Sequence, residues 1–129
     1  MPAGESKRIL AVLEDLFFMV KINEAAKRAG LPIDFVKGEQ DVLAKAVDKN
    51  GARPVLIIVD LNFSGIDPLK LVATLKSSDD TKGINLIGYL SHVQGELKVA
   101  AQDAGCDMVM ARSAFSQNLP QILKRYGGS

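Results

Sequence analysis

Short apolar runs alternate with longer amphipathic segments along this chain. An apolar run of four to eight residues is too short for a helix and is typical of a strand buried on both faces. Such runs occupy residues 9–13, 33–36, 54–60, 84–90 and 107–111. The run that ends at Asp60 is rich in β-branched residues and lacks polar alternation, which predicts a central strand.

Apolar residues recur at helical spacing between these runs. The expected helices cover 16–29, 39–49, a segment that starts at 68, 93–104 and 116–126. Gly30 and Gly105 stand where helix C-caps are expected. Asp67 precedes Pro68 as an N-cap precedes the first helical residue. Pro120 is expected near the first turn of the last helix, where a missing N–H costs least.

Strict alternation of five strands with five helices predicts an α/β fold with a parallel sheet covered on both faces, because parallel strands need crossover connections. A doubly wound, flavodoxin-like sheet of five strands is expected to have the order 2-1-3-4-5. The ligand site of such a sheet lies beyond the carboxyl ends of the strands, between strands 1 and 3.

The length and charge of the chain limit its organisation. Its 129 residues suit one domain, expected over 8–126, with flexible tails at 1–7 and 127–129. With 16 basic and 15 acidic residues the net charge is +1, which gives no electrostatic reason to expect binding to nucleic acid or membrane. No apolar run approaches the ~20 residues of a membrane span, and no signal peptide is evident, so we expect a cytoplasmic protein.

Carboxylates follow the two strands that flank the expected site. Glu14 and Asp15 come after the first strand, and Asp60 ends the third. Three acids at neighbouring strand ends repel one another unless a cation lies among them, and oxygen ligands suit Mg²⁺. Asn62 could add a backbone carbonyl. In the simpler interpretation, Asp15 and Asp60 only cap helices or turns.

Three segments carry a resemblance to a known family: residues 12–15 (VLED), 57–62 (IIVDLN) and 104–107 (AGCD). Through these segments, the chain resembles the receiver domains of two-component response regulators, and the resemblance extends over residues 8–126. The resemblance implies that Asp60 accepts a phosphoryl group from a sensor histidine kinase or phosphotransfer protein. It also implies that Mg²⁺ is held by Glu14, Asp15, Asp60 and the Asn62 carbonyl. It implies a signalling domain, not an enzyme, which contacts a downstream protein through the face of its fourth helix, fifth strand and fifth helix.

The chain departs from the receiver pattern at the two residues that normally complete the site. Leu90 takes the position of the usual Thr or Ser, and Ser91 follows one residue later. Because side chains alternate along a strand, Ser91 can substitute only if the strand end twists or the register differs by one. Arg112 takes the position of the usual Lys, and its planar fork is not equivalent to a compact ammonium.

Further departures concern the residues that would relay a signal. Ser113 replaces a Pro after the Lys position, so we expect a trans bond there and a reshaped loop. Val109 replaces an aromatic residue, and the loop after Asp60 lacks the Pro expected at Ser64 and the Gly expected at Pro68. The acceptor and the acid pair are retained, whereas the sensing residues are not. This is the pattern of an atypical receiver.

Two other hypotheses remain open. The first is a pseudo-receiver, in which the same fold is a protein-interaction module that is not phosphorylated. The second is a small enzyme or ligand-binding domain, which ranks lowest because the acidic turn after the first strand would repel a phosphate or flavin without a cation. No phosphate-cradling glycine loop is present. His92 is the only histidine and is expected in a surface loop; Cys106 is expected to be a small buried residue.

Overall fold

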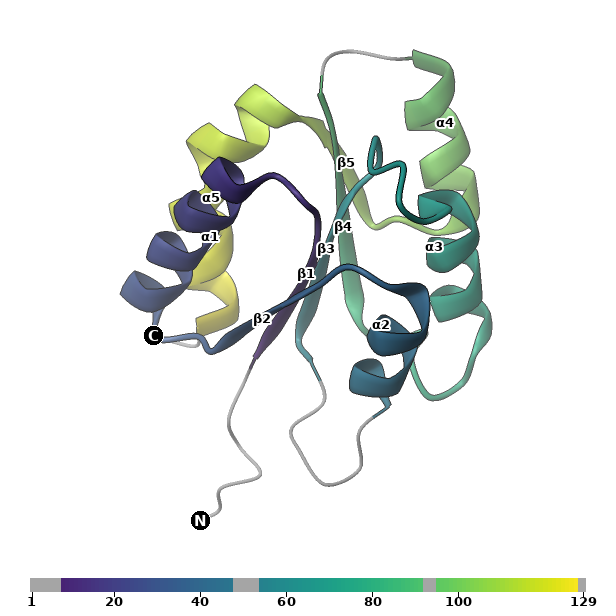
Figure 1. Cartoon of the computed structure of the whole chain (residues 1–129), viewed down its shortest axis with the longest axis horizontal. Helices are drawn as coiled ribbons and strands as arrows, with labels where there is room; N and C mark the ends of the chain where they lie inside the picture. Colours follow the sequence, from purple (N-terminus) through teal and green to yellow (C-terminus); the bar gives the residue numbers. More distant parts are fainter. Residues whose placement is uncertain (1–7, 48–53, 92–94, 128–129) are drawn as a thin grey trace.

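The computed structural model describes residues 8–47, 54–91 and 95–127, which form one α/β sandwich (Figure 1). Its strands are β1 (Ile9–Val12), β2 (Ile33–Val36), β3 (Leu56–Asp60), β4 (Asn85–Leu90) and β5 (Met108–Ala111). Its helices are α1 (Leu16–Ala29), α2 (Glu39–Ala46), α3 (Pro68–Ser77), α4 (Gly95–Ala104) and α5 (Arg112–Gly127). All strand pairs are parallel, in the order β2-β1-β3-β4-β5. The predicted fold class and strand order are therefore confirmed.

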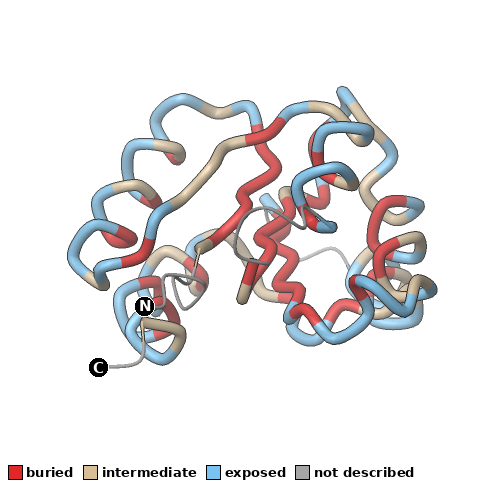
Figure 2. Tube along the Cα trace, turned by 90° about the horizontal axis from the view of Figure 1, so that it is seen from below, coloured by how far each residue is buried: buried red, intermediate tan, exposed pale blue. Residues whose placement is uncertain are grey.

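The sheet separates two apolar cores. Helices α1 and α5 cover one face, and α2, α3 and α4 cover the other (Figure 1). Along β3, Leu56 and Ile58 belong to the core under α1 and α5, whereas Ile57 and Val59 belong to the opposite core. Figure 2 shows the buried residues running through the strands and the inner sides of the helices. Because side chains alternate, Asp60 continues the row of Leu56 and Ile58 and is directed to the face of α1 and α5.

Helix α1 has the bounds that its pattern predicts, and both ends are capped. The Oδ1 atom of Asp15 accepts the backbone N–H groups of Phe17 (2.9 Å) and Phe18 (3.2 Å). Gly30 closes the helix in the left-handed conformation, with φ of 74°, which a residue with a Cβ adopts at a cost. At α3, Asp67 is the N-cap and Pro68 the first residue, as predicted.

Helix α5 differs from the prediction at its start. It begins at Arg112, directly after β5, and not at residue 116. Pro120 consequently lies inside the helix, and the prediction that it lies near the first turn is wrong. The helix also includes Gly127, the first residue of the predicted C-terminal tail. The predicted trans bond between Arg112 and Ser113 is confirmed, because the described residues contain no cis peptide bond.

Other differences at element ends are small. Strand β1 ends one residue early, at Val12, and β3 starts at Leu56 and not at residue 54. The predicted extension of α2 to residue 49 and the start of α4 at residue 93 reach positions outside the described residues. The same holds for His92 and for the N-terminal tail. None of the described helices is long and apolar enough to cross a membrane.

Candidate functional site

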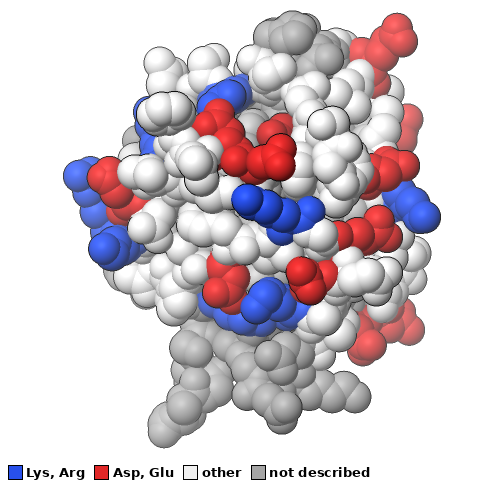
Figure 3. Space-filling view, in the orientation of Figure 1, with Lys and Arg blue, Asp and Glu red and all other residues white. Residues whose placement is uncertain are grey.

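Side chains from three elements meet at the carboxyl edge of the sheet. Asp15 follows β1, Asp60 ends β3, and Arg112 starts α5. Strands β1 and β3 are neighbours, so this edge is the switch point where the strand order reverses. On the face that Figure 3 presents, acidic and basic side chains lie intermixed, which favours local ion pairs over one large field of a single sign.

Asp15 and Arg112 form an ion pair at this edge. Arg112 donates a hydrogen bond from Nη2 to Oδ2 of Asp15, while Oδ1 of Asp15 caps α1. The Arg112 hydrogen bond, followed by the Phe18 N–H, holds the pKa of Asp15 below its usual value. The guanidinium carbon of Arg112 also lies 4.6 Å from the centroid of the Phe18 ring, a cation–π contact. Arg112 is therefore fixed by two partners on α1.

Asp60 is half-buried beside this ion pair. Its Oδ1 accepts the backbone N–H of Asn62 at 2.9 Å. Burial raises the pKa of Asp60, and the charge of Asp15 adds to the rise, whereas the Asn62 N–H and the charge of Arg112 oppose it. The charge of Arg112 thus acts on both carboxylates.

The predicted magnesium ligands do not form an acidic cluster in this arrangement. Glu14 is exposed, and both oxygens of Asp15 are engaged by backbone N–H groups and by Arg112. Within the described ranges, no three His, Cys, Asp or Glu side chains are grouped so that they could hold a metal ion. As they stand, these residues do not fit a metal. The site of Glu14, Asp15, Asp60 and Asn62 stays a prediction that requires Arg112 to leave Asp15.

The residues at the end of β4 lie on opposite sides of the sheet. Leu90 is buried in the core on the side of α3 and α4. Ser91 is exposed and lines the same cavity as Arg112. Its backbone N–H donates to Oδ1 of Asn62 at 2.7 Å, which ties the end of β4 to the loop after Asp60. Of the two, Ser91 is therefore on the side of the candidate site.

An aromatic cluster, which we did not predict, lies beneath Arg112. It consists of Phe18, Tyr89 and Phe115; the rings of Tyr89 and Phe115 are stacked, with centroids 5.3 Å apart. Tyr89 pairs in register with Asp60, so both residues lie at the same level of neighbouring strands. The Val109 position, aromatic in the receiver pattern, is instead in the opposite core. A signal for Tyr89 was present in the sequence, because it stands one residue before Leu90 and alternation puts it on the other face.

The hydroxyl of Tyr89 is buried and has no hydrogen-bond partner in the part of the chain that the structure describes. Burial, and next the charge of Asp60, raise the pKa of Tyr89. The phenol is therefore neutral at physiological pH. Cys106 is buried as predicted, and burial raises its pKa to about 11, which leaves the thiol unreactive.

The sequence matches no family model and no curated protein. Solved structures do match. The phosphorylated cyanobacterial phytochrome response regulator RcpA has a TM-score of 0.78 and 23% identity, over 93% of this chain and 90% of that one. The Mn²⁺-bound response regulator Rcp1 has a TM-score of 0.76 and 19% identity, over 92% and 90%. The chemotaxis response regulator CheY4 of Vibrio cholerae has a TM-score of 0.77 and 19% identity, over 94% and 98%.

These likenesses cover nearly the whole chain and show its fold. The protein has the fold of a response-regulator receiver domain, as its sequence resemblance predicts. At these identities the likeness shows the fold, and the activity has to be argued from the site.

Proposed function

We propose that this chain is a receiver module of two-component signalling that accepts a phosphoryl group on Asp60 and works in the cytoplasm. The observation that carries the proposal is the position of Asp60. It ends the central strand of a receiver fold, half-buried at the switch point, with the cation Arg112 acting on its carboxylate. The donor would be a sensor histidine kinase or a phosphotransfer protein.

The transfer needs an ionised carboxylate and a nearby positive charge. A carboxylate oxygen of Asp60 attacks phosphorus while the bond between phosphorus and the donor nitrogen breaks, which leaves an acyl phosphate on the aspartate. Catalysis of phosphoryl transfer consists mostly of positioning and of neutralising charge on the phosphoryl oxygens. We assign the neutralisation to Arg112, whose charge reaches Asp60. Ser91, which lines the cavity beside Arg112, is the hydroxyl donor closest in position to the usual Thr or Ser.

The role of a metal stays a separate part of the proposal. The Mn²⁺-bound form of Rcp1 supports divalent binding by a domain of this fold, and Mg²⁺ suits oxygen ligands. In this chain such an ion would compete with Arg112 for Asp15. We therefore derive no step of the transfer from it.

The alternative is a pseudo-receiver that binds its partner without phosphorylation. The ion pair between Asp15 and Arg112 favours it, because the pair already neutralises a carboxylate that a receiver uses for its metal. In either case the proposed output face consists of α4, β5 and α5. Val99 on α4 and Met108 on β5 are 54% and 42% exposed, and such apolar side chains suit contact with a downstream protein.

Treatment with a phosphodonor separates the two hypotheses. The protein is incubated with Mg²⁺ and acetyl phosphate, or with beryllofluoride, and followed by intact mass and by amide NMR shifts. We expect the mass of one added phosphoryl group and shifts around Asp60. Asp60→Asn should abolish the adduct, whereas Asp103→Asn, which changes an exposed acid on α4, should retain it. Absence of both adduct and shifts would leave the pseudo-receiver.

A further inference from the structure

A cavity of about 490 Å³ opens beside the candidate site, between the first turns of α1 and α5. The side chains that line it include two cations, Lys21 and Arg112, and the hydroxyls of Ser91, Ser113 and Ser116. The rings of Phe17 and Phe18 complete the lining. Its volume lies within the ~300–1,000 Å³ that is usual for pockets that bind small organic ligands, and it is widely open to solvent, so a bound ligand would stay partly exposed.

The polar part of this lining is suited to an anion. None of the described residues that line the cavity is acidic. Asp15, the N-cap of α1, forms an ion pair with Arg112, so Arg112 has to exchange this partner for a phosphate. Hydroxyl and cationic donors together match the oxygens of a phosphate group. This ion pair partly offsets the acidic turn after β1, which would repel a phosphate, and Lys21 adds a further positive charge to the lining.

The apolar part of the lining offers a planar surface. Phe17 is 89% exposed, more than any other large apolar residue that the structure describes. It is the second residue of α1, whereas its neighbour Phe18 is buried beneath Arg112. An exposed ring at the edge of a cationic cavity can stack on a flat ring of a ligand, as aromatic side chains stack on bases in nucleic-acid complexes.

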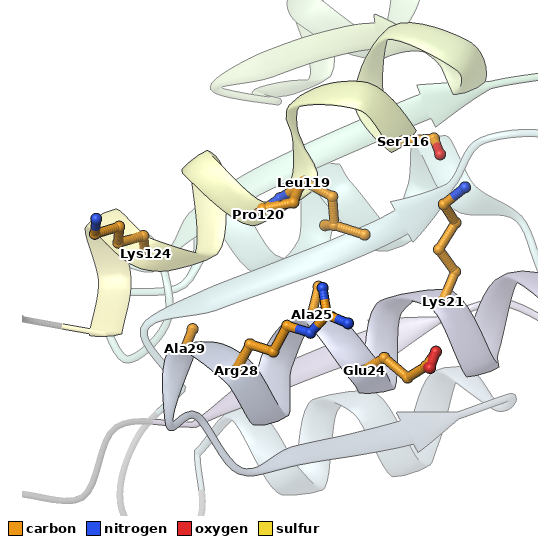
Figure 4. Close-up of a pocket in the computed structure, with 9 residues that line it drawn as sticks. All are labelled: Lys21, Glu24, Ala25, Arg28, Ala29, Ser116, Leu119, Pro120 and Lys124. Carbon is orange, nitrogen blue, oxygen red and sulfur yellow. The ribbon is translucent and has the colours of Figure 1, made fainter.

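The cavity continues along the groove between α1 and α5. A second cavity, also of about 490 Å³, shares Lys21 and Ser116 with the first and adds the cations Arg28 and Lys124. Figure 4 shows Lys21 reaching from α1 toward Ser116 on α5. One acid, Glu24, lies among the described residues that line this second cavity. A ligand with a second phosphate would thus meet further positive charge.

We propose that the cavity beside Arg112 binds a nucleotide, with the base on Phe17 and a phosphate between Lys21, Arg112 and the serine hydroxyls of α5. This ligand site is separate from the acceptor role of Asp60 and does not depend on it. It would let the level of a small phosphorylated metabolite act on the same edge of the sheet that the proposed phosphorylation uses.

The test is a titration of the full chain with adenosine 5′-monophosphate, followed by amide NMR shifts. We expect saturable shifts of Phe17, Lys21 and Ser113. Adenosine alone and inorganic phosphate alone should each bind at least about tenfold more weakly, because each makes half of the contacts. Guanosine, cytidine and uridine monophosphates, tested in the same way, define the preference for the base.

Exposed residues provide variants that leave the fold unchanged. Phe17→Ala and Lys21→Gln should each weaken nucleotide binding about fivefold or more. Two controls should not change it: Val20→Ala truncates an exposed apolar residue on α1, and Lys27→Gln removes a charge from α1, both outside the two cavities. Asp60→Asn should retain nucleotide binding even though it abolishes phosphorylation.

Several outcomes would overturn the proposal. They are no saturable shift with any of the four nucleotides, binding no tighter than that of inorganic phosphate, or binding that both Phe17→Ala and Lys21→Gln leave unchanged. If the phosphodonor gives no adduct but the nucleotide binds, the acceptor role fails and this inference stands. The reverse result would remove the nucleotide site and leave the acceptor.

Discussion

Arg112 is hydrogen-bonded to Asp15 across 97 residues of sequence, and the contact joins the first turn of α5 to the N-cap of α1. Each partner has a second task at its own helix. Asp15 caps α1, and Arg112 lies over the Phe18 ring. The pair therefore affects the charge at the mouth of the site and adds a polar contact between two helices that pack on the same apolar core.

Removal of Arg112 should favour metal binding. Arg112→Gln frees Oδ2 of Asp15 and removes a unit positive charge that would oppose a divalent ion. A charge at about 4 Å contributes roughly 1–4 kcal/mol in a solvated site, so we expect Mn²⁺ affinity to rise by about tenfold or more. Paramagnetic broadening of amide signals near Asp15 measures it. Arg125→Gln, an exposed substitution late in α5, is the control, and equal affinity in both variants would contradict the expectation.

The Asp15 carboxylate should make stability depend on acid pH. Its pKa is lower in the folded protein than the usual 3.8, so its contribution is present above about pH 4 and is lost as pH falls through the lowered pKa. Asp15→Asn keeps the N-cap but weakens the ion pair. We expect it to cost up to about 1 kcal/mol at pH 7, because both partners are partly exposed, and less below pH 4.

Urea unfolding of Asp15→Asn and of the unsubstituted protein at several pH values checks this prediction. Asp103→Asn, which changes an exposed acid on α4, should show no such convergence at low pH. A gap between the curves that is independent of pH would assign the effect to packing and not to the charge.

Asp60 should have the opposite effect on stability. Its pKa is raised by burial, so the folded state disfavours its ionised form at neutral pH. Asp60→Asn keeps an oxygen for the Asn62 N–H and removes the buried charge. We expect a gain in the free energy of unfolding at pH 7, below about 1 kcal/mol, which disappears as pH falls below the usual value of 3.8. Urea unfolding at pH 7 and pH 3 measures the gain, and a loss of stability at pH 7 would contradict it.

The hydroxyl of Tyr89 should reduce the stability of the protein. Because it is buried without a partner among the described residues, Tyr89→Phe removes an unsatisfied polar group and keeps the stacked ring. We expect a gain of about 1 kcal/mol in the free energy of unfolding. Tyr126→Phe, at a partly exposed ring on α5, should change little. A loss of stability in Tyr89→Phe would indicate that the hydroxyl has a hydrogen-bond partner in solution.

The strands, their order and the position of the candidate site at the carboxyl edge of the sheet could be predicted, because each follows from local patterns in the sequence. The run that ends at Asp60 is apolar on both faces because both faces are covered. The start of α5 was predicted wrongly because Ala111, the residue before it, is not a capping residue, whereas Ser113 and Ser116 resemble one. The serines are instead in the first turns of a helix that begins directly after β5.

The partner of Asp15 could not be predicted for a different reason. The sequence places acids and Arg112 at the same edge, but whether an acid faces a metal or a guanidinium depends on side-chain geometry. Tyr89 was missed because the comparison with receivers directs attention to Leu90 and Ser91. Its importance comes from the register that sets it beside Asp60.

Helix α5 begins at the residue that follows β5, so no loop separates the two elements. Arg112 stands at this junction, and its ion pair with Asp15 connects the junction to the N-cap of α1. A phosphoryl group on Asp60 or a nucleotide phosphate that draws the guanidinium away from Asp15 would break this connection. A displacement of Arg112 would then pass to β5 and to α5 without an intervening loop.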